Sequence, residues 1–269
     1  MDLPWYIGPM LDVHHERPGL AIGELRSVEN YDALVEEAIR FDDENQYLYN
    51  DRDLNLPNCI GKMSNHISGT GNVRTYRLWV DDDTYYCDGS SEWTEDFDPS
   101  NRDMPNKDKY PLLWNTIKDI PDLCTVRINT LEPNNASYFH SEKFVVLYKG
   151  VITLRLRFHI PLLPPGAISH MYMNKETYLM EREKLYFFNQ SAVHAPVNLG
   201  TEKRMHLVID NFFTKDVIDW IGDITPSTPI HVADEMPENL YHARQHPLIT
   251  DDMVIPENIN IIDWKKLNL

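Results

Sequence analysis

The fold is decided by the stretch ITLRLRFHIPLLPPG, which runs from Ile152 to Gly166. Every second residue through its centre is apolar: Leu154, Leu156, Phe158 and Ile160. The residues between them are basic or can become so: Arg155, Arg157 and His159. Successive side chains of a strand point to opposite faces, so this alternation predicts a strand with one apolar and one basic face. If the basic face meets water, the strand is an ordinary half-buried one; if it meets a cavity, it forms an anion site.

The sequence around this stretch predicts many short strands. Strand-like runs follow one another from Cys124 to Phe213, separated by turn signals and with no helical pattern between them. Such spacing is typical of an antiparallel sandwich or barrel. Earlier in the chain, apolar spacing predicts a helix over Ser27–Phe41 and a short helix over Tyr110–Pro121, and alternation predicts a strand over Val73–Val80.

We expect these elements to form one structural domain in three parts. Residues 1–120 are an N-terminal α/β lead-in packed on the core, residues 121–215 are the β core, and residues 216–269 are an irregular C-terminal extension. The acidic, turn-rich segment 81–98 is either a solvated surface excursion or a lid.

The composition of the chain argues against two classes of binding partner. The chain has 25 Lys and Arg against 42 Asp and Glu, a formal net charge of −17. Such a surface repels phosphate backbones and anionic headgroups, so we expect no nucleic acid and no membrane partner. The cysteines, Cys59, Cys87 and Cys124, match neither a zinc pattern nor a disulfide framework. The first residues lack signal-peptide features and no apolar run is long enough to span a bilayer, which predicts a cytoplasmic protein.

Candidate metal ligands lie in the β region. His140 and Glu142 are two positions apart, so their side chains point the same way in an extended chain. Two imidazoles and one carboxylate can occupy one side of Fe(II) and leave its other positions open. His194 is the candidate for the second imidazole. Each of these residues alone is compatible with a surface or core role; their order, together with Arg157-x-His159 and a later Arg204, favours a metal site.

This order of residues resembles the aspartyl/asparaginyl β-hydroxylase family, which also includes bacterial proline hydroxylases. The resemblance rests on three segments: VRINTLEPNNASYFHSEK, LRLRFHIPLL and YLMEREKLYFFNQSAVHAPVNLGTEKRMHLVID. It implies a mainly β fold, the double-stranded β-helix or cupin-type jelly roll, with flanking helices. It also implies an oxidoreductase, a dioxygenase that uses iron as Fe(II), 2-oxoglutarate as cosubstrate and O2.

The resemblance also assigns residues. His140 and His194 are implied as the imidazole ligands of the metal. Arg204 is implied as the partner of the C5 carboxylate of 2-oxoglutarate. Arg157 and His159 are implied to hold the other carboxylate end of the cosubstrate or its immediate surroundings, which would make the basic face of the opening stretch an internal anion site.

The substrate side is less determined. Glu142 stands where many family members have Asp; because Glu is one methylene longer, it either ligates the metal or leaves a two-histidine site. Arg127, Tyr138 and Arg155 are the candidate substrate residues. The predicted reaction hydroxylates an unactivated C–H of a free amino acid or amino-acid-like small molecule and releases succinate and CO2. The alternatives are hydroxylation of an Asp-, Asn- or Pro-like side chain within a peptide or protein, a cupin-type metalloenzyme that does not use 2-oxoglutarate, and a non-catalytic β-sandwich binding module.

Overall fold

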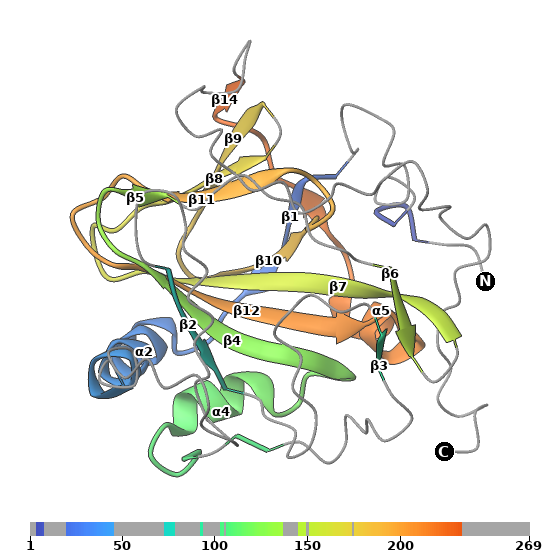
Figure 1. Cartoon of the computed structure of the whole chain (residues 1–269), viewed down its shortest axis with the longest axis horizontal. Coiled ribbons are helices and arrows are strands. Elements are labelled where there is room, and N and C mark those ends of the chain that lie inside the picture. Colours follow the sequence, from blue (N-terminus) through green and yellow to red (C-terminus); the bar gives the residue numbers. More distant parts are fainter. Residues whose placement is uncertain are drawn as a thin grey trace.

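The protein is built on two facing, mainly antiparallel sheets (Figure 1). A computed structural model describes residues 4–7, 20–45, 73–78, 92–93, 103–104, 106–136, 145–148, 151–173 and 175–232. The longer sheet has the strand order β13 (Thr225–Pro226), β1 (Ile22–Ser27), β10 (Lys184–Phe188), β7 (Val151–Leu162), β12 (Arg204–Phe212), β4 (Leu123–Leu131) and β2 (Val73–Arg77). At its side, β6 (Val145–Tyr148) pairs with β7 and with β3 (Glu92–Trp93). The smaller sheet has the order β14 (His231–Val232), β9 (Glu176–Met180), β8 (Ser169–Met173), β11 (His194–Asn198) and β5 (Asn135–Ala136).

The strand order is that of a jelly roll. Strands β4, β7, β10 and β12 lie in the longer sheet, and β5, β8, β9 and β11 lie in the smaller one. The chain therefore passes back and forth between the sheets, so that strands distant in sequence become neighbours. The predicted fold class, a mainly β jelly roll of the cupin type with flanking helices, is confirmed. Strands β4 to β12 lie, to within one residue, in the region from Cys124 to Phe213, where the sequence predicted successive short strands.

Two of the helices were also predicted. α2 (Tyr31–Asn45) buries Leu34, Val35 and Ala38, the three- and four-residue spacing of one helix face. α4 (Pro111–Ile117) begins at a proline, whose missing N–H costs nothing in the first turn.

A third helix, α5 (Lys215–Ile221), was not predicted. The Thr214 side chain accepts a hydrogen bond from the backbone N–H of Val217 at its start, and Gly222, with φ of 66°, ends it. α5 has only seven residues, and a segment of this length is too short for hydrophobic periodicity to distinguish a helix from a turn.

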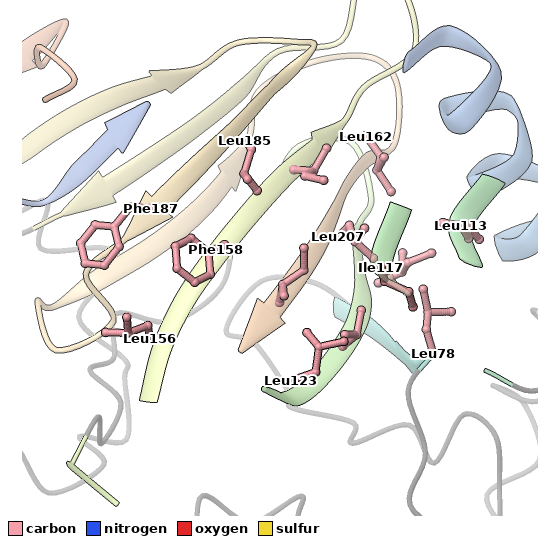
Figure 2. Close-up of a cluster of buried hydrophobic side chains, with 14 of the residues drawn as sticks. Leu78, Leu113, Ile117, Leu123, Leu156, Phe158, Leu162, Leu185, Phe187 and Leu207 are labelled. Carbon is pink, nitrogen blue, oxygen red and sulfur yellow. The ribbon is translucent and has the colours of Figure 1, made fainter. Parts of the chain in front are cut away.

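The outer face of the longer sheet packs on these helices. Figure 2 shows the cluster, in which side chains of β7, β10 and β12 meet those of α4. The alternating apolar residues of the opening stretch, among them Leu156, Phe158 and Leu162, belong to this cluster and are almost completely buried. Because strand side chains alternate, the basic residues of the same strand point into the space between the two sheets.

The lead-in contains a strand that the sequence pattern did not predict. β1 pairs with β10 and with β13 and so extends the longer sheet. A Cβ atom at Gly23 would lie 2.2 Å from Cγ2 of Ile224, so this strand can pack closely only because residue 23 lacks a side chain.

In the described part of the chain, no helix combines the length and apolarity needed to cross a bilayer.

Candidate active site between the sheets

The basic face of β7 is buried. The exposed fractions of Arg155, Arg157 and His159 are 8%, 2% and 7%. A half-buried strand with its basic face in water is thereby excluded. The inward orientation predicted for this face is confirmed, whereas a bound dianion stays a prediction.

Strand register places a set of polar groups opposite this face. Arg157 pairs in register with Asp210 of β12, and His159 pairs with Val208 of the same strand. On the other side, His159 pairs with Tyr186 of β10. Paired residues of adjacent strands share a face, so residues of β7, β10 and β12 line one internal surface.

Asp210 holds two of the arginines. Arg157 donates from Nε to Oδ1 at 2.7 Å and from Nη2 to Oδ2 at 3.1 Å. Arg127 donates from Nη1 to Oδ2 at 2.8 Å, and the Thr125 hydroxyl lies 3.0 Å from the same oxygen. Burial alone raises the pKa of the Asp210 carboxyl, but the charges of Arg157, Arg127 and Arg155 outweigh it and hold that pKa far below its usual range. This ionic cluster is complete without any ligand.

Arg204 is in a different situation. Its side chain is 3% exposed, and its Nε donates to Oγ of Ser169 at 2.9 Å. Its Nη2 is buried and has no hydrogen-bond partner, and no carboxylate among the described residues forms an ion pair with it. Burial lowers the pKa of Arg204 to about 9, without an opposing carboxylate to raise it. A buried cation of this kind costs free energy until an anion pairs with it.

Two histidines continue from Arg204 along the inner surface. Nδ1 of His159 lies 3.1 Å from Nδ1 of His206, and Nε2 of His206 lies 2.7 Å from Oγ of Ser169. Nε2 of His159 is buried and has no hydrogen-bond partner in the described ranges. Burial, reinforced by nearby guanidinium groups, holds the pKa of both imidazoles well below the usual value, so both rings are neutral at pH 7.

His194 comes from the opposite sheet. It begins β11, it is 3% exposed, and its Nδ1 lies 2.8 Å from the backbone oxygen of Ala192. A carbonyl oxygen only accepts, so Nδ1 carries the hydrogen and Nε2 of the neutral ring carries the lone pair that a metal needs. The Phe188 ring stacks on His159 at 4.6 Å between centroids and meets His194 edge-on at 4.8 Å. One phenyl ring thus lies between the two imidazoles.

The structure brings together only some of the predicted site residues. Arg155, Arg157, His159, His194 and Arg204 all lie buried in the jelly-roll core, with Arg127 at its edge. Three further predictions, His140, Glu142 and Tyr138, lie outside the described residues. No group of three metal-ligating side chains occurs within the described ranges, where only one of the three predicted ligands lies.

Sequence reasoning missed Ser169. In β8, Ser169 alternates with its neighbours His170 and Tyr172. The strand β8 buries Ser169, Met171 and Met173 and leaves His170 and Tyr172 half-buried. The alternation of side chains along a strand was therefore the sequence signal that could have assigned Ser169 to the inner face.

A separate pocket of about 330 Å³ lies on the other face of the longer sheet. Its floor includes Ile160, Leu185 and Ile209, which belong to the outer apolar cluster. The sheet itself therefore separates this pocket from the internal polar surface.

Fold and site define the class: a jelly-roll protein with a buried, uncompensated arginine and an inward-facing histidine whose tautomer suits a metal. The sequence matches the aspartyl/asparaginyl β-hydroxylase family over residues 71–212, and the chain belongs to this family. It is a 2-oxoglutarate-dependent dioxygenase of the hydroxylase type, as predicted, and the alternative of a non-catalytic binding module is wrong. Fe(II), 2-oxoglutarate and O2 are the family's reagents.

Solved structures with a related fold are distant. A prolyl-4-hydroxylase from Pseudomonas putida is 12% identical, with 78% of this chain and 98% of that chain covered and a TM-score of 0.38. A 2OG-Fe(II) oxygenase-family oxidoreductase from Burkholderia pseudomallei is 13% identical, with coverages of 70% and 94% and a TM-score of 0.35. A cupin-like protein from Thermotoga maritima is 12% identical, with coverages of 68% and 92% and a TM-score of 0.32. A comparison with curated proteins gives no match.

Proposed function

We propose that this protein hydroxylates an unactivated C–H of a free amino acid or amino-acid-like small molecule, using Fe(II), 2-oxoglutarate and O2 and releasing succinate and CO2. The observation that carries the proposal is Arg204, a buried guanidinium whose Nη2 has no hydrogen-bond partner among the described residues. A protein keeps such a group only where an anion completes the pair. The family's cosubstrate is a dianion.

Arg204 is assigned to the C5 carboxylate of 2-oxoglutarate. A guanidinium presents its donors in a fixed planar fork that matches a carboxylate, and such charge-assisted bonds are strong where water is excluded. Ser169 already accepts from Nε and so fixes the plane of that fork. The remaining buried donor of the fork, Nη2, is the one assigned to the ligand.

His194 is assigned to the metal, together with His140 and, by sequence, Glu142. The support is its burial and its tautomer, since the bond to the Ala192 oxygen leaves Nε2 as the ligating nitrogen. Fe(II) held by two imidazoles and a carboxylate would supply the redox chemistry with O2. This chain's own residues would orient the cosubstrate and exclude water from the reacting groups.

Arg157 and His159 are assigned to the other end of the cosubstrate, in different roles. Arg157 donates two hydrogen bonds to Asp210, so it would act on the cosubstrate from a fixed position with its charge already balanced. His159 has an unpartnered Nε2 on the same inner face and would contact the cosubstrate directly.

Arg155 supports a substrate that carries its own carboxylate, whereas Arg127 already donates to Asp210. Arg155 is a buried guanidinium on the inner face of β7, two positions from Arg157. A free amino acid brings an α-carboxylate that can pair with such a group, whereas a residue within a peptide does not. A side chain of a peptide or protein is the second candidate. The family's name, taken from hydroxylation of Asp and Asn, favours this alternative.

An anaerobic titration tests the metal and cosubstrate assignments. We expect a visible charge-transfer band that requires both Fe(II) and 2-oxoglutarate. His194→Ala should remove metal binding and the band, whereas His231→Ala, at an exposed position, is the matched control and should change neither. Metal uptake without any response to 2-oxoglutarate would overturn the assignment of Arg204.

A mass-spectrometric screen separates the two substrate classes. Free amino acids and peptides are incubated with the protein, Fe(II), 2-oxoglutarate and O2, and products with one added oxygen atom are sought. Modification of free amino acids alone supports the proposal, and modification confined to peptides replaces it by the alternative. Glu142→Ala in the same assay tells a ligand, whose loss abolishes turnover, from a two-histidine site that keeps it.

A further inference from the structure

Four buried side chains form one continuous hydrogen-bonded chain: Arg204, Ser169, His206 and His159. Its direction follows from the chemistry of its first member. A guanidinium only donates, so Oγ of Ser169 accepts from Arg204. The Ser169 hydroxyl then has its own hydrogen to give, and Nε2 of His206 lies 2.7 Å away to receive it.

The rest of the chain follows from the neutrality of both rings. If Nε2 of His206 accepts, the single hydrogen of that ring is on Nδ1 and points at Nδ1 of His159, 3.1 Å away. Nδ1 of His159 therefore accepts, and the hydrogen of His159 is on Nε2. Nε2 is the atom that has no hydrogen-bond partner in the part of the protein that the structure describes.

The opposite direction leaves a defect. In that direction His159 would donate to His206, and His206 would donate to Oγ of Ser169. Oγ would then accept two hydrogen bonds, and its own hydrogen would have no acceptor, since no further hydrogen bond of Ser169 exists among the described residues. A buried hydroxyl without an acceptor is unfavourable, so the direction that starts at Arg204 is preferred.

We propose that His206, acting with Ser169, is a positioning residue that fixes His159 in its Nε2–H tautomer, so that His159 presents a neutral donor to the bound anion. The identity of that anion as 2-oxoglutarate rests on the proposed function above. Without this constraint, Nε2 of His159 could carry a lone pair, which repels a carboxylate oxygen. Arg204 thus determines, through the neutral side chains of Ser169 and His206, which nitrogen of His159 carries the hydrogen.

The contrast with His194 strengthens the proposal. Both His159 and His194 are buried and contact the same ring, Phe188. A carbonyl oxygen forces Nδ1–H on His194, which leaves a lone pair at Nε2, whereas the relay from Arg204 forces Nε2–H on His159. The chain thereby gives one imidazole the tautomer of a metal ligand and the other the tautomer of an anion donor.

The first test reads the tautomers directly in the metal-free protein. Nitrogen-15 NMR of the imidazole rings distinguishes Nδ1–H from Nε2–H, and His159→Gln identifies the signals of that ring. We expect Nε2–H for His159 in the wild-type protein, a changed tautomer population in His206→Leu, and the wild-type pattern in His231→Gln. An Nδ1–H pattern for wild-type His159 overturns the proposal, and this result requires no variant at His206 to fold.

The second test compares two substitutions of His206 by 2-oxoglutarate affinity, with Mn(II) in place of iron. His206→Leu removes both hydrogen bonds, whereas His206→Asn keeps an amide N–H near the position of Nδ1. We expect binding about tenfold weaker in His206→Leu and within about threefold of wild type in His206→Asn, with unchanged Mn(II) affinity in both.

The outcomes separate this inference from the proposed function. A wild-type protein that does not bind 2-oxoglutarate overturns the proposed function, and the tautomer result stands by itself. A wild-type protein that binds 2-oxoglutarate, beside a folded His206→Leu variant with unchanged affinity and unchanged His159 tautomer, overturns the inference alone. Ser169→Ala, which breaks the relay one step earlier, should give the same direction of change as His206→Leu.

Discussion

Two buried ionic groups on one strand, the cation Arg204 and the anion Asp210, differ in whether a partner compensates their charge. They lie six positions apart on the inner face of β12, and both are almost completely buried. Asp210 is surrounded by guanidinium groups that compensate its charge, whereas Arg204 donates to the neutral Ser169 and forms no ion pair among the residues that the structure describes. Burial of charge is common to a structural ion pair and a binding site; the missing counter-ion marks the binding site.

The pKa values express the same difference. The guanidinium groups overcome burial and lower the pKa of Asp210, so folding favours its charged form. Burial acts unopposed on Arg204 and lowers its pKa to about 9, so folding disfavours its charged form. The charges stabilise one end of the strand, whereas the buried charge of Arg204 costs free energy at the other end, where we propose that a ligand binds.

The largest expected effect comes from removing the partner of Asp210. Arg157→Leu leaves the carboxylate buried and only partly compensated, which should lower the free energy of unfolding by about 3–5 kcal/mol. The measurement is urea denaturation at pH 7. Arg204→Leu is the matched control: it replaces an uncompensated cation by an apolar side chain and should leave the free energy of unfolding unchanged or raise it. If both variants lose the same free energy of unfolding, the two ends of β12 do not differ in charge compensation.

The next effect concerns binding. Arg204→Leu should weaken 2-oxoglutarate binding by at least about thirtyfold, because truncating one partner of a buried charge pair costs about 2 kcal/mol or more. Calorimetry with Mn(II) in place of iron measures it, and the Mn(II) affinity should not change. Arg204→Lys keeps the charge and loses the fork, so an intermediate affinity is expected. If the variant binds 2-oxoglutarate as the wild type does, the anion site lies elsewhere.

A smaller effect depends on pH. The folded-state pKa of Asp210 lies below its unfolded value of about 4, so its contribution to stability is complete above that pH and declines as the pH falls toward the folded-state pKa. The slope is at most about 1.4 kcal/mol per pH unit. Unfolding of wild type and Asp210→Asn at pH 7 and pH 3 should show a larger stability difference at pH 7. A difference that is constant with pH would mean that the charge on Asp210 is not what stabilises the fold.

Sequence alone predicted the part of this molecule that depends on local periodicity. Alternation predicted β7 with one apolar and one basic face. The strand-like runs from Cys124 to Phe213 predicted the neighbouring strands. β1 was missed because only two of its six residues are buried and because it depends on Gly23 fitting against Ile224, which is a tertiary contact.

The candidate site was predictable in its residue types but not in its pairings. Arg157 and Arg204 are both arginines on inner strands, and nothing local distinguishes them. The register of β7 against β12 places Asp210 opposite Arg157 and leaves Arg204 at the far end of the strand beside Ser169. Register across about fifty residues is set by the whole sheet, so no short motif carries it.

The smallest effect separates two roles for Arg127. This residue was a candidate for substrate binding, yet it donates to Oδ2 of Asp210 and is 19% exposed. Because Arg157 remains in place, Arg127→Leu should cost only about 1 kcal/mol in the free energy of unfolding, the size of one partly screened charged hydrogen bond. Steady-state kinetics complete the comparison. A purely structural Arg127 leaves KM for the hydroxylated substrate unchanged, whereas a rise in KM of tenfold or more, at unchanged 2-oxoglutarate dependence, would assign it to the substrate as well.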